Sequence, residues 1–444
     1  MPSEETVAGG GAGSGKNSLS RRDFLKLGGV GLAGVAMLGG SGCGGGGEAS
    51  GKVVFASWPG PSSFHGLIDK FNEQNKGKFQ VTYRVMAADT WQRFDMFKTE
   101  LQAGGGDIDI VGGTSSWTAE FAENGWVTDV SSRFPKDQRS KFVKGQIQSL
   151  TYESKIWGVP WLADVGILFY RQDLLDQSGF SEPPKTWEEL KEMSKKVMKD
   201  SATRYGFVFQ GAINETGTCN GLEYIWTHGG EVLDGDRVII GSPESVAGLT
   251  TEQSMVAEGV APRAVANYTL LESLTAFLNG DAIFCRWWPS LYGTASDPGM
   301  SKIKPEQMGV SPLPVGDEQR QTTSCLGGDN LLINASSEMK DEAWEFIRFI
   351  TSEESQKTWA LAEPNVPARK TLYDHRQVLD AMPVISTTKK ALQSARLRPV
   401  SPYYSEISRK MAEQFNSVLT DDTLPEQAVE TLQSELTQVI ERGQ

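Results

Sequence analysis

Short apolar runs alternate with amphipathic segments along most of the chain from position 52 onward. The first run is Val53–Ala56, and the segment after it carries apolar residues at positions i, i+3, i+4 and i+7, namely Phe64, Leu67, Ile68 and Phe71. A short apolar run predicts a strand, and apolar residues at the i, i+3, i+4 and i+7 spacing predict one buried face of a helix. The alternation therefore predicts an α/β fold with a mostly parallel sheet.

The same patterns predict further elements along the chain. The next strands and helices are expected at Phe79–Met86, Trp91–Gln102, Ile108–Val111 and Pro425–Glu441. A threonine followed three residues later by glutamate predicts a helix start at Thr186 and another at Thr351. Asp234-Gly235 has the residue types of a tight hairpin turn.

Length and charge limit the organisation and the partners of this chain. Its 444 residues are too many for one compact core, so two domains are expected. The composition, 39% hydrophobic and 22% charged, is that of an ordinary soluble protein. A net charge of −13 would repel phosphate backbones, which excludes nucleic acid as an expected partner.

Histidines and cysteines are too few and too scattered to predict a metal site. The three histidines, His65, His228 and His375, have no metal-ligand spacing, and no two cysteines form a zinc-type pair. We therefore expect neither a metal nor a cofactor. The mature chain is left with three thiols once Cys43 is modified as described below, so at most one internal disulfide can join two of Cys219, Cys285 and Cys325.

Residues 1–50 are interpreted as an export and lipoprotein signal followed by a flexible tether. Ser20–Lys26 reads S-R-R-D-F-L-K, which resembles the twin-arginine export signal. The apolar stretch Leu27–Gly42 that follows has sixteen residues with seven glycines, short of the roughly 20 apolar residues of a membrane span. Ser41-Gly42-Cys43 resembles the end of a bacterial lipobox, although Gly40 stands where an aliphatic residue is usual. This resemblance predicts lipidation of Cys43, with a glycine-rich tether behind it.

A series of short signposts follows one order along the mature chain. They are Leu101–Gly104, Asp107–Ile110, Trp117-x-x-Glu120-Phe121, Gly125-Trp126, Val159–Trp161 with Asp164, Tyr170-Arg171, Phe277-x-x-Gly280, Trp288-Pro289 and Leu326–Gly328. Their order and spacing resemble the extracellular solute-binding proteins of carbohydrate ABC importers over essentially the whole mature chain. The segment Arg398–Tyr404 resembles the trehalose- and maltose-binding branch of that family.

The resemblance implies two α/β lobes with a ligand cleft between them, joined by crossover segments near Leu162, Pro312 and Pro367. The implied N-terminal lobe comprises residues 51–162 and 313–366, and the C-terminal lobe comprises residues 163–312 and 367–444. The lobes are expected to close on a ligand like a hinged clamp.

The resemblance also implies roles for individual residues. Asp164 matches a carboxylate that accepts sugar hydroxyls, Trp288 a ring platform, Gly328 a backbone contact, Arg398 a guanidinium donor and Tyr404 a second aromatic contact. These groups suit a sugar, because charged groups bind paired hydroxyls and ring faces cover its C–H surface. The chain departs from the branch in having Thr114 in place of Asp, Leu162 in place of Tyr and Asp329 in place of Trp, which leaves the identity of the sugar open.

Two further candidates and several alternatives follow from the residues themselves. Trp58 ends the first predicted strand, where ligands bind in open α/β sheets, although it could instead pack at the rim. Glu272 precedes Phe277 on one helix and could reach the cleft or face solvent. Trp288 could be core, Asp164 could form a structural salt bridge, and Arg398 could form a surface ion pair.

The expected function is therefore a lipid-anchored, monomeric, non-enzymatic protein that captures a sugar and passes it to an ABC permease. One alternative is a binder of a polyol, a glycerol phosphate or a peptide. A second is a glycoside-active enzyme that uses Asp164 and Glu272 as its two carboxylates. A third is an adhesion or sensor lipoprotein with the same fold.

Overall fold

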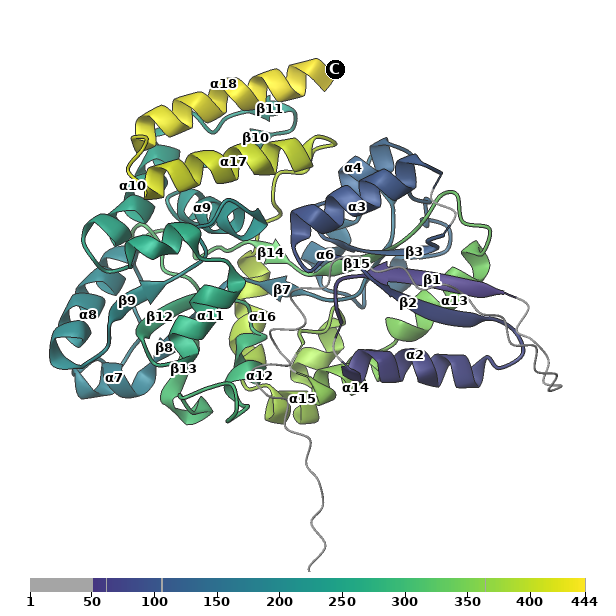
Figure 1. The fold of residues 1–444 in the computed structure, drawn as a ribbon, viewed down its shortest axis with the longest axis horizontal. Coiled ribbons are helices and arrows are strands. Elements are labelled where there is room, and N and C mark those ends of the chain that lie inside the picture. Colours follow the sequence, from purple (N-terminus) through teal and green to yellow (C-terminus); the bar gives the residue numbers. More distant parts are fainter. Residues whose placement is uncertain (1–50, 61, 105–106, 364, 444) are drawn as a thin grey trace, which may run out of the picture. The chain divides into compact units, whose positions relative to one another are not determined.

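Two mixed β-sheets, each with its own helices, form two lobes in the part of the chain that the computed structural model describes (Figure 1). That part is residues 51–443 without residues 61, 105–106 and 364. The predicted two-lobe α/β fold is confirmed. The twin-arginine motif and Cys43 lie outside the described residues. Within the described ranges, no helix combines the length and the apolar character needed to cross a membrane.

The first lobe contains a five-stranded sheet in the order β2-β1-β3-β15-β6. Its strands are β1 Lys52–Ser57, β2 Gln80–Val85, β3 Ile110–Thr114, β6 Val159–Pro160 and β15 Asp329–Ile333. Successive side chains of a strand point to opposite faces. Phe55 packs with helices α2 (Ser62–Gln74) and α13 (Lys340–Ile350), whereas its neighbour Ala56 packs with α3 (Thr90–Gln102) and α4 (Thr118–Glu123). Both faces of this sheet are therefore covered.

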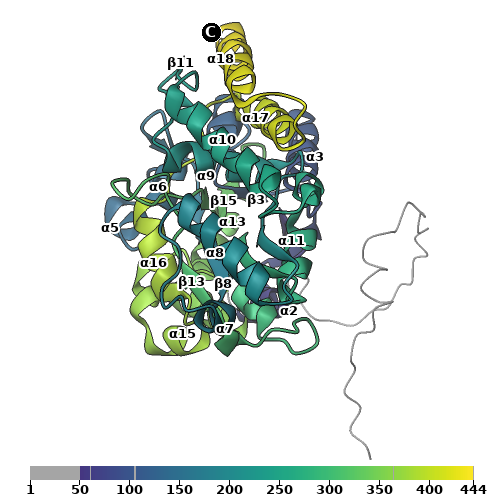
Figure 2. The same ribbon diagram turned by 90° about the vertical axis from the view of Figure 1, so that its left-hand side faces the viewer.

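The second lobe contains a four-stranded sheet in the order β13-β8-β12-β9. Its strands are β8 Ile167–Arg171, β9 Tyr205–Val208, β12 Ala282–Trp287 and β13 Met308–Ser311. Two groups of helices pack on opposite faces of it, α7 (Gln172–Gln177) and α8 (Trp187–Asp200) on one and α11 (Leu270–Leu278) and α16 (Ile385–Ser394) on the other. A further layer, prominent in Figure 2, consists of α9 Glu215–Thr227, α10 Pro243–Ala257, α17 Tyr404–Leu419 and α18 Pro425–Gly443.

Shorter elements connect these layers. The helices are α5 Lys136–Arg139, α6 Lys144–Ser149, α12 Leu291–Ala295, α14 Glu353–Ala362 and α15 Arg376–Ala381, with 3-10 turns at Arg263–Asn267, Pro305–Gln307 and Lys370–Asp374. The short strands pair as β4 Thr151–Tyr152 with β5 Lys155–Ile156, β7 Asp164–Val165 with β14 Leu326–Gly327, and β10 Leu233–Asp234 with β11 Arg237–Val238.

The expectation of a mostly parallel sheet is wrong. Among the described strands, only β1–β2, β1–β3 and β9–β12 pair in parallel, and the other sheet neighbours are antiparallel. The reason is the path of the chain. Strand β15 enters the first sheet only after the chain has passed through the second sheet, and it pairs antiparallel with both β3 and β6.

The predicted helix start is confirmed at Thr186 and wrong at Thr351. Thr186 caps α8, and the carboxylate of Glu189 returns to the backbone of Thr186, as a capping box requires. Thr351 instead ends α13, and its hydroxyl donates to the carbonyl of Ile347. Ser352, one residue later, caps α14. The predicted hairpin at Asp234-Gly235 is confirmed, with Gly235 at a φ of 59°.

The chain passes between the lobes near residues 162 and 367. Leu162 bridges Pro367, and the amide of Ala163 donates to the carbonyl of Val366 at 3.1 Å. Strand β7 follows at once and pairs with β14. These neighbouring strands bring Asp164 and the glycine pair Gly327-Gly328 together at the junction of the two lobes.

Candidate ligand-binding site

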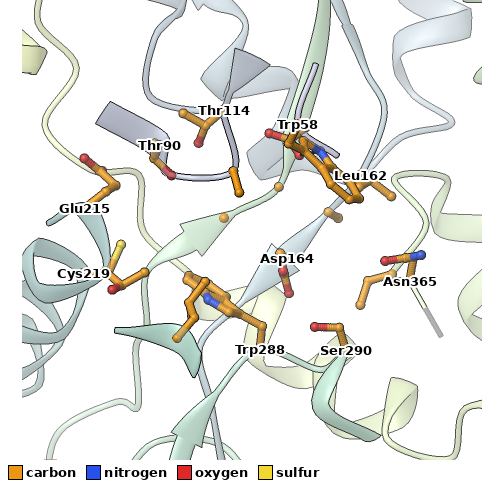
Figure 3. Close-up of a pocket in the computed structure, with 18 of the residues that line it drawn as sticks. Trp58, Thr90, Thr114, Leu162, Asp164, Glu215, Cys219, Trp288, Ser290 and Asn365 are labelled. Carbon is orange, nitrogen blue, oxygen red and sulfur yellow. Dashed lines mark hydrogen bonds between the residues drawn. The ribbon is translucent and has the colours of Figure 1, made fainter. Parts of the chain in front are cut away.

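A cavity of about 360 Å³ lies between the two lobes (Figure 3). The first lobe contributes the ends of β1 and β3 and the start of β15, which carry Trp58, Thr114 and Asp329. The second contributes α9 with Glu215 and the segment after β12 with Trp288. Its volume falls within the range of about 300–1,000 Å³ that is usual for small-molecule sites.

Seven of the nine predicted ligand contacts line this cavity. They are Trp58, Thr114, Asp164, Trp288, Gly328, Asp329 and Arg398. Tyr404 lies behind the wall, and Glu272 lies elsewhere on the second lobe. Because the seven come from distant parts of the sequence, the fold assembles most of the predicted set in one place.

Asp164 reaches into the cavity with almost no partners of its own. Among the described residues, its one hydrogen-bond donor is the amide of its neighbour Val165, at 3.0 Å. Burial raises the pKa of this carboxyl to about 7, although the Val165 amide and the guanidinium of Arg286 act in the opposite direction. A carboxylate that is desolvated without donors is costly, so Asp164 is ready to accept hydrogen bonds from a bound molecule.

The glycine pair opposite Asp164 has a geometric requirement. A Cβ at Gly327 would come within 2.9 Å of the Trp288 ring, and one at Gly328 would lie 2.3 Å from the carbonyl oxygen of Leu162. Gly328 also has a φ of 98°, a conformation that favours glycine. The pair therefore allows β14 and the crossover at residue 162 to approach closely, and it leaves the cavity open.

Asp329 differs from Asp164 in that its hydrogen-bond donor is a side chain and not the adjacent backbone amide. The indole nitrogen of Trp58 donates to Oδ2 of Asp329 at 2.8 Å. Burial raises the pKa of Asp329, whereas the guanidinium of Arg93 lowers it. Arg93 also lines the cavity, and its Nη1 is held by the carbonyl oxygens of Ala87 and Ala88. The first lobe thus presents a carboxylate, an indole and a guanidinium on one wall.

Glu215, which the sequence analysis did not single out, is the most heavily bonded acid of the cavity. Its Oε1 accepts from Nη1 of Arg398 and from the hydroxyl of Tyr404, each at 2.5 Å. Its Oε2 accepts from the hydroxyl of Ser408 at 2.7 Å and from the indole of Trp91 at 3.0 Å. Glu215 opens α9 directly after the capping residue Asn214, and this helix start was the only signal in the sequence.

Arg398 connects the two lobes. While Nη1 binds Glu215, its Nη2 donates to the hydroxyls of Thr114 at 3.0 Å and Ser115 at 2.9 Å. Arg398 is 6% exposed, so its pair with Glu215 is not the surface ion pair considered as an alternative. Most of its donors are already used within the protein, and Arg398 therefore organises the cavity wall more than it offers free hydrogen bonds. The Tyr404 hydroxyl, bound to Glu215, supports the wall from behind.

Trp288 combines two of the roles considered for it. It packs against buried residues of the second lobe, and it also lines the cavity (Figure 3). The guanidinium of Arg286 lies 4.1 Å from its ring centroid, and Arg286 is itself held by two hydrogen bonds to Glu223. This buried ion pair fixes the position of the ring.

The position of Glu272 corrects the expectation that it reaches the cleft. Its Oε2 accepts from the amide of Thr269 at 2.8 Å and from the Thr269 hydroxyl at 2.5 Å, in the capping box of α11. The carboxylate therefore stabilises the start of its own helix, and Glu272 does not line the cavity.

The comparisons with known proteins agree with this geometry. A family model described as bacterial extracellular solute-binding protein matches residues 56–357. A probable ABC transporter-binding protein of Deinococcus radiodurans is 30% identical over 79% of this chain and 84% of its own. A maltotriose-binding protein of Pyrococcus abyssi is 26% identical over 73% of this chain and 68% of its own. The solved structure of maltose-bound T. maritima MalE3 matches with a TM-score of 0.81 and 32% identity, covering 87% of this chain and 99% of that one. The chain belongs to the family of bacterial extracellular solute-binding proteins.

Proposed function

We propose that this chain captures a disaccharide or short oligosaccharide of the trehalose or maltose type and delivers it to the membrane permease of an ABC importer. The observation that carries the proposal is the convergence of Asp164, with its unused acceptors, and the Trp288 ring in one cavity. The carboxylate accepts sugar hydroxyls, and the ring covers the C–H face of a pyranose. Solved and curated relatives named for maltose and maltotriose support the same class of ligand.

The residues of the proposed site have two roles: some contact the sugar, and others support the cavity wall. Asp164, Asp329, Trp58 and Trp288 contact the sugar directly, and the backbone of Gly328 shapes the site. Thr114, Arg398 and Tyr404 hold the wall through Glu215 and its neighbours. Residues 51–162 and 328–366 form one lobe of this proposal, and residues 163–327 and 367–444 form the other. The expected crossover near Pro312 is corrected to the segment near Gly328, because Leu313, Cys325 and Leu326 pack in the clusters of the second lobe. The bonds from Arg398 to Thr114 and Ser115 then join residues of opposite lobes, so they belong to the closed form.

Family membership implies a location outside the cytoplasm. The route and the anchor are further parts of the proposal: export through the twin-arginine motif, with Arg21 and Arg22 as its signature, and attachment through a lipid on Cys43. Changing Arg21 and Arg22 to lysine should leave the precursor in the cytoplasm. Cys43→Ala should release the exported protein from the membrane fraction. Normal surface delivery or continued membrane retention would contradict the respective step.

A thermal-shift panel of sugars on residues 51–444 tests the ligand class. A ligand that binds only the folded state raises the melting temperature in proportion to the logarithm of its concentration. Disaccharides and maltooligosaccharides should raise it, with a change in tryptophan fluorescence because indoles line the cavity. Stabilisation by polyols, glycerol phosphates or peptides alone would overturn the carbohydrate proposal.

The phosphate and enzyme alternatives gain little from the site. Asp164 and Asp329 add negative charge to the cavity, and the guanidinium of Arg398 is paired with Glu215. Arg93 also lines the cavity, but a single guanidinium beside Asp329 is not the cluster of cations that a phosphate requires. The enzyme hypothesis relied on Asp164 and Glu272 acting together, and Glu272 does not line the cavity. Mass spectrometry of the sugars after incubation would detect any bond cleavage.

A further inference from the structure

Two cysteines from distant parts of the chain lie in direct contact beside the ligand cavity. The sulfur atoms of Cys219, on α9, and Cys325, immediately before β14, are 3.3 Å apart. Both side chains are buried in the same cluster of apolar residues. Cys285, the third cysteine in the described ranges, belongs to the other core of this lobe, where its sulfur approaches the carbonyl oxygen of Ser273. Only the first two are therefore in position to react with each other among the described residues.

The backbone already holds these two cysteines together without a bond between the sulfurs. The amide of Cys325 donates to Oε1 of Glu223, one turn after Cys219 on the same helix, at 3.0 Å. Cys325 also forms a bridge with Arg396 on its other side. A sulfur–sulfur bond of about 2.05 Å requires the two atoms to approach by roughly 1.2 Å, which side-chain rotation and small backbone shifts can supply.

We propose that Cys219 and Cys325 form an intramolecular disulfide in the exported protein. The compartment outside the cytoplasm is oxidising, and disulfides form and persist there. A disulfide of a thiol–disulfide oxidoreductase is the oxidant. One cysteine thiolate attacks that bond to give a mixed disulfide and expels one oxidant thiolate. The second cysteine thiolate then displaces the other oxidant sulfur, so that two cysteine thiols are oxidised and one oxidant disulfide is reduced to two thiols.

The position of the pair indicates when the bond forms. Cys219 lines the cavity, whereas Cys325 is fully buried, and burial raises the pKa of the Cys325 thiol well above its usual value. The reactive thiolate is therefore disfavoured in the closed, folded state. Oxidation is expected while the cleft is open and Cys219 on its wall can be reached, and closure then protects the bond from reductants.

The bond would tie two walls of the cavity together. Cys219 lies on the helix that starts with Glu215, and Cys325 leads into Leu326-Gly327-Gly328, which faces Asp164. The two cysteines are 106 positions apart, and a cross-link across a long loop strongly restricts the unfolded chain. The disulfide should therefore raise the melting temperature and hold α9 against β14 when no ligand is present.

Peptide mapping of the full chain tests the proposal. The protein is isolated from its native compartment, denatured, alkylated without reductant and digested. A peptide that joins Cys219 to Cys325 should be found by mass spectrometry, with Cys285 alkylated. Free Cys219 and Cys325 in that sample, and still free after refolding with oxidised glutathione, would overturn the proposal. A link from either cysteine to Cys285 would also overturn it.

The melting temperature supplies a second readout with a matched control. Dithiothreitol, applied during a cycle of unfolding and refolding so that it reaches the buried bond, should lower the melting temperature of the wild type and of Cys285→Ser, and should leave that of Cys219→Ser and Cys325→Ser unchanged. If these two variants do not fold, the comparison of wild type with Cys285→Ser decides: a reductant-insensitive melt of both overturns the proposal. The inference depends on the location outside the cytoplasm and not on the identity of the ligand. A failed sugar panel with a mapped disulfide would therefore leave it standing.

Discussion

Glu215 and Asp164 are two carboxylates of the same cavity with opposite surroundings. Glu215 accepts four hydrogen bonds, among them one from the guanidinium of Arg398 and one from the hydroxyl of Tyr404. Asp164 accepts one, from the amide next to it. Buried polar groups are nearly always hydrogen-bonded, and an unpaired one calls for an explanation. Glu215 therefore belongs to the structural wall of the cavity, whereas Asp164 is available to a ligand.

The two acids should therefore respond differently to mutation. Removal of one partner from the Glu215 cluster leaves a buried charge uncompensated, which destabilises the fold. Replacement of Asp164 removes a group that the ligand-free protein itself barely uses, which should weaken binding more than folding. Asp329 lies between these two cases, because it accepts a bond from the Trp58 side chain and has the guanidinium of Arg93 nearby.

The largest expected effect is on folding stability when Arg398 is changed to methionine. Glu215 loses its cation, and removal of one partner of a buried ion pair typically costs about 3–5 kcal/mol. Denaturant unfolding of the ligand-free protein measures this loss. Arg237→Met, which breaks the exposed ion pair with Asp234, is the matched control and should cost less than about 1 kcal/mol. Equal losses in the two variants would show that the buried cluster does not stabilise the wall.

The next effect is on affinity when Asp164 is changed to asparagine. The variant keeps the shape of the side chain and loses a charged acceptor, so binding of the sugar should weaken by about 1.5–3 kcal/mol, roughly ten- to a hundredfold or slightly more. The unfolding free energy of the ligand-free protein should stay the same or rise, because a desolvated charge is removed. Calorimetric titration and thermal melts measure both quantities. Normal binding together with a collapsed melting temperature would make Asp164 a structural residue.

Asp164 could be predicted from the sequence as a site residue and Glu215 could not, for a physical reason. A carboxylate inside the apolar run from Val159 to Tyr170 is conspicuous, because burial there needs compensation. Glu215 stands in the first turn of a helix behind a capping asparagine, which is where an acid is ordinarily expected. Its partners come from two distant segments, one with Trp91 and the other with Arg398 and Tyr404, and only the folded chain brings them together.

Prediction of the fold was limited in the same way, because local patterns were visible in the sequence and long-range pairings were not. Apolar periodicity located the first strands and helices, such as β1, α2 and α3, because it is a local property of the sequence. Strand direction depends on the route of the chain between lobes, so the antiparallel entry of β15 was missed. The threonine-glutamate pattern at Thr269 is a real capping box, and it accounts for Glu272 without any ligand.

A smaller effect is expected from Trp58→Phe, which removes the one donor to the Asp329 carboxylate found in the described part of the chain while keeping an aromatic ring. The variant makes Asp329 resemble Asp164 in its lack of partners. Because one hydrogen bond to a partly solvated acid is lost, we expect sugar affinity to fall by no more than about tenfold, or roughly 1.4 kcal/mol. Isothermal titration measures the change. A loss as large as that of Asp164→Asn would mean that the indole stacks on the sugar as well as orienting Asp329.

A last effect is a dependence of stability and affinity on pH, which follows from the raised pKa of Asp164. Burial raises this pKa from 3.8 to about 7 in the folded, ligand-free protein. Between these values the folded state holds a proton that the unfolded state has released, so stability falls as the pH rises through this window and levels off above it. Asp164→Asn should flatten that slope.

Sugar hydroxyls donate to the ionised form, and affinity should therefore increase from pH 6 to pH 8 in the wild type and stay constant in Asp164→Asn. Glu252, buried on α10 with a pKa raised to about 8 by burial, provides the control: Glu252→Gln should change the slope of stability and leave that of affinity intact. An affinity slope that survives in Asp164→Asn would assign the titration to another group, with Asp329 the first to examine.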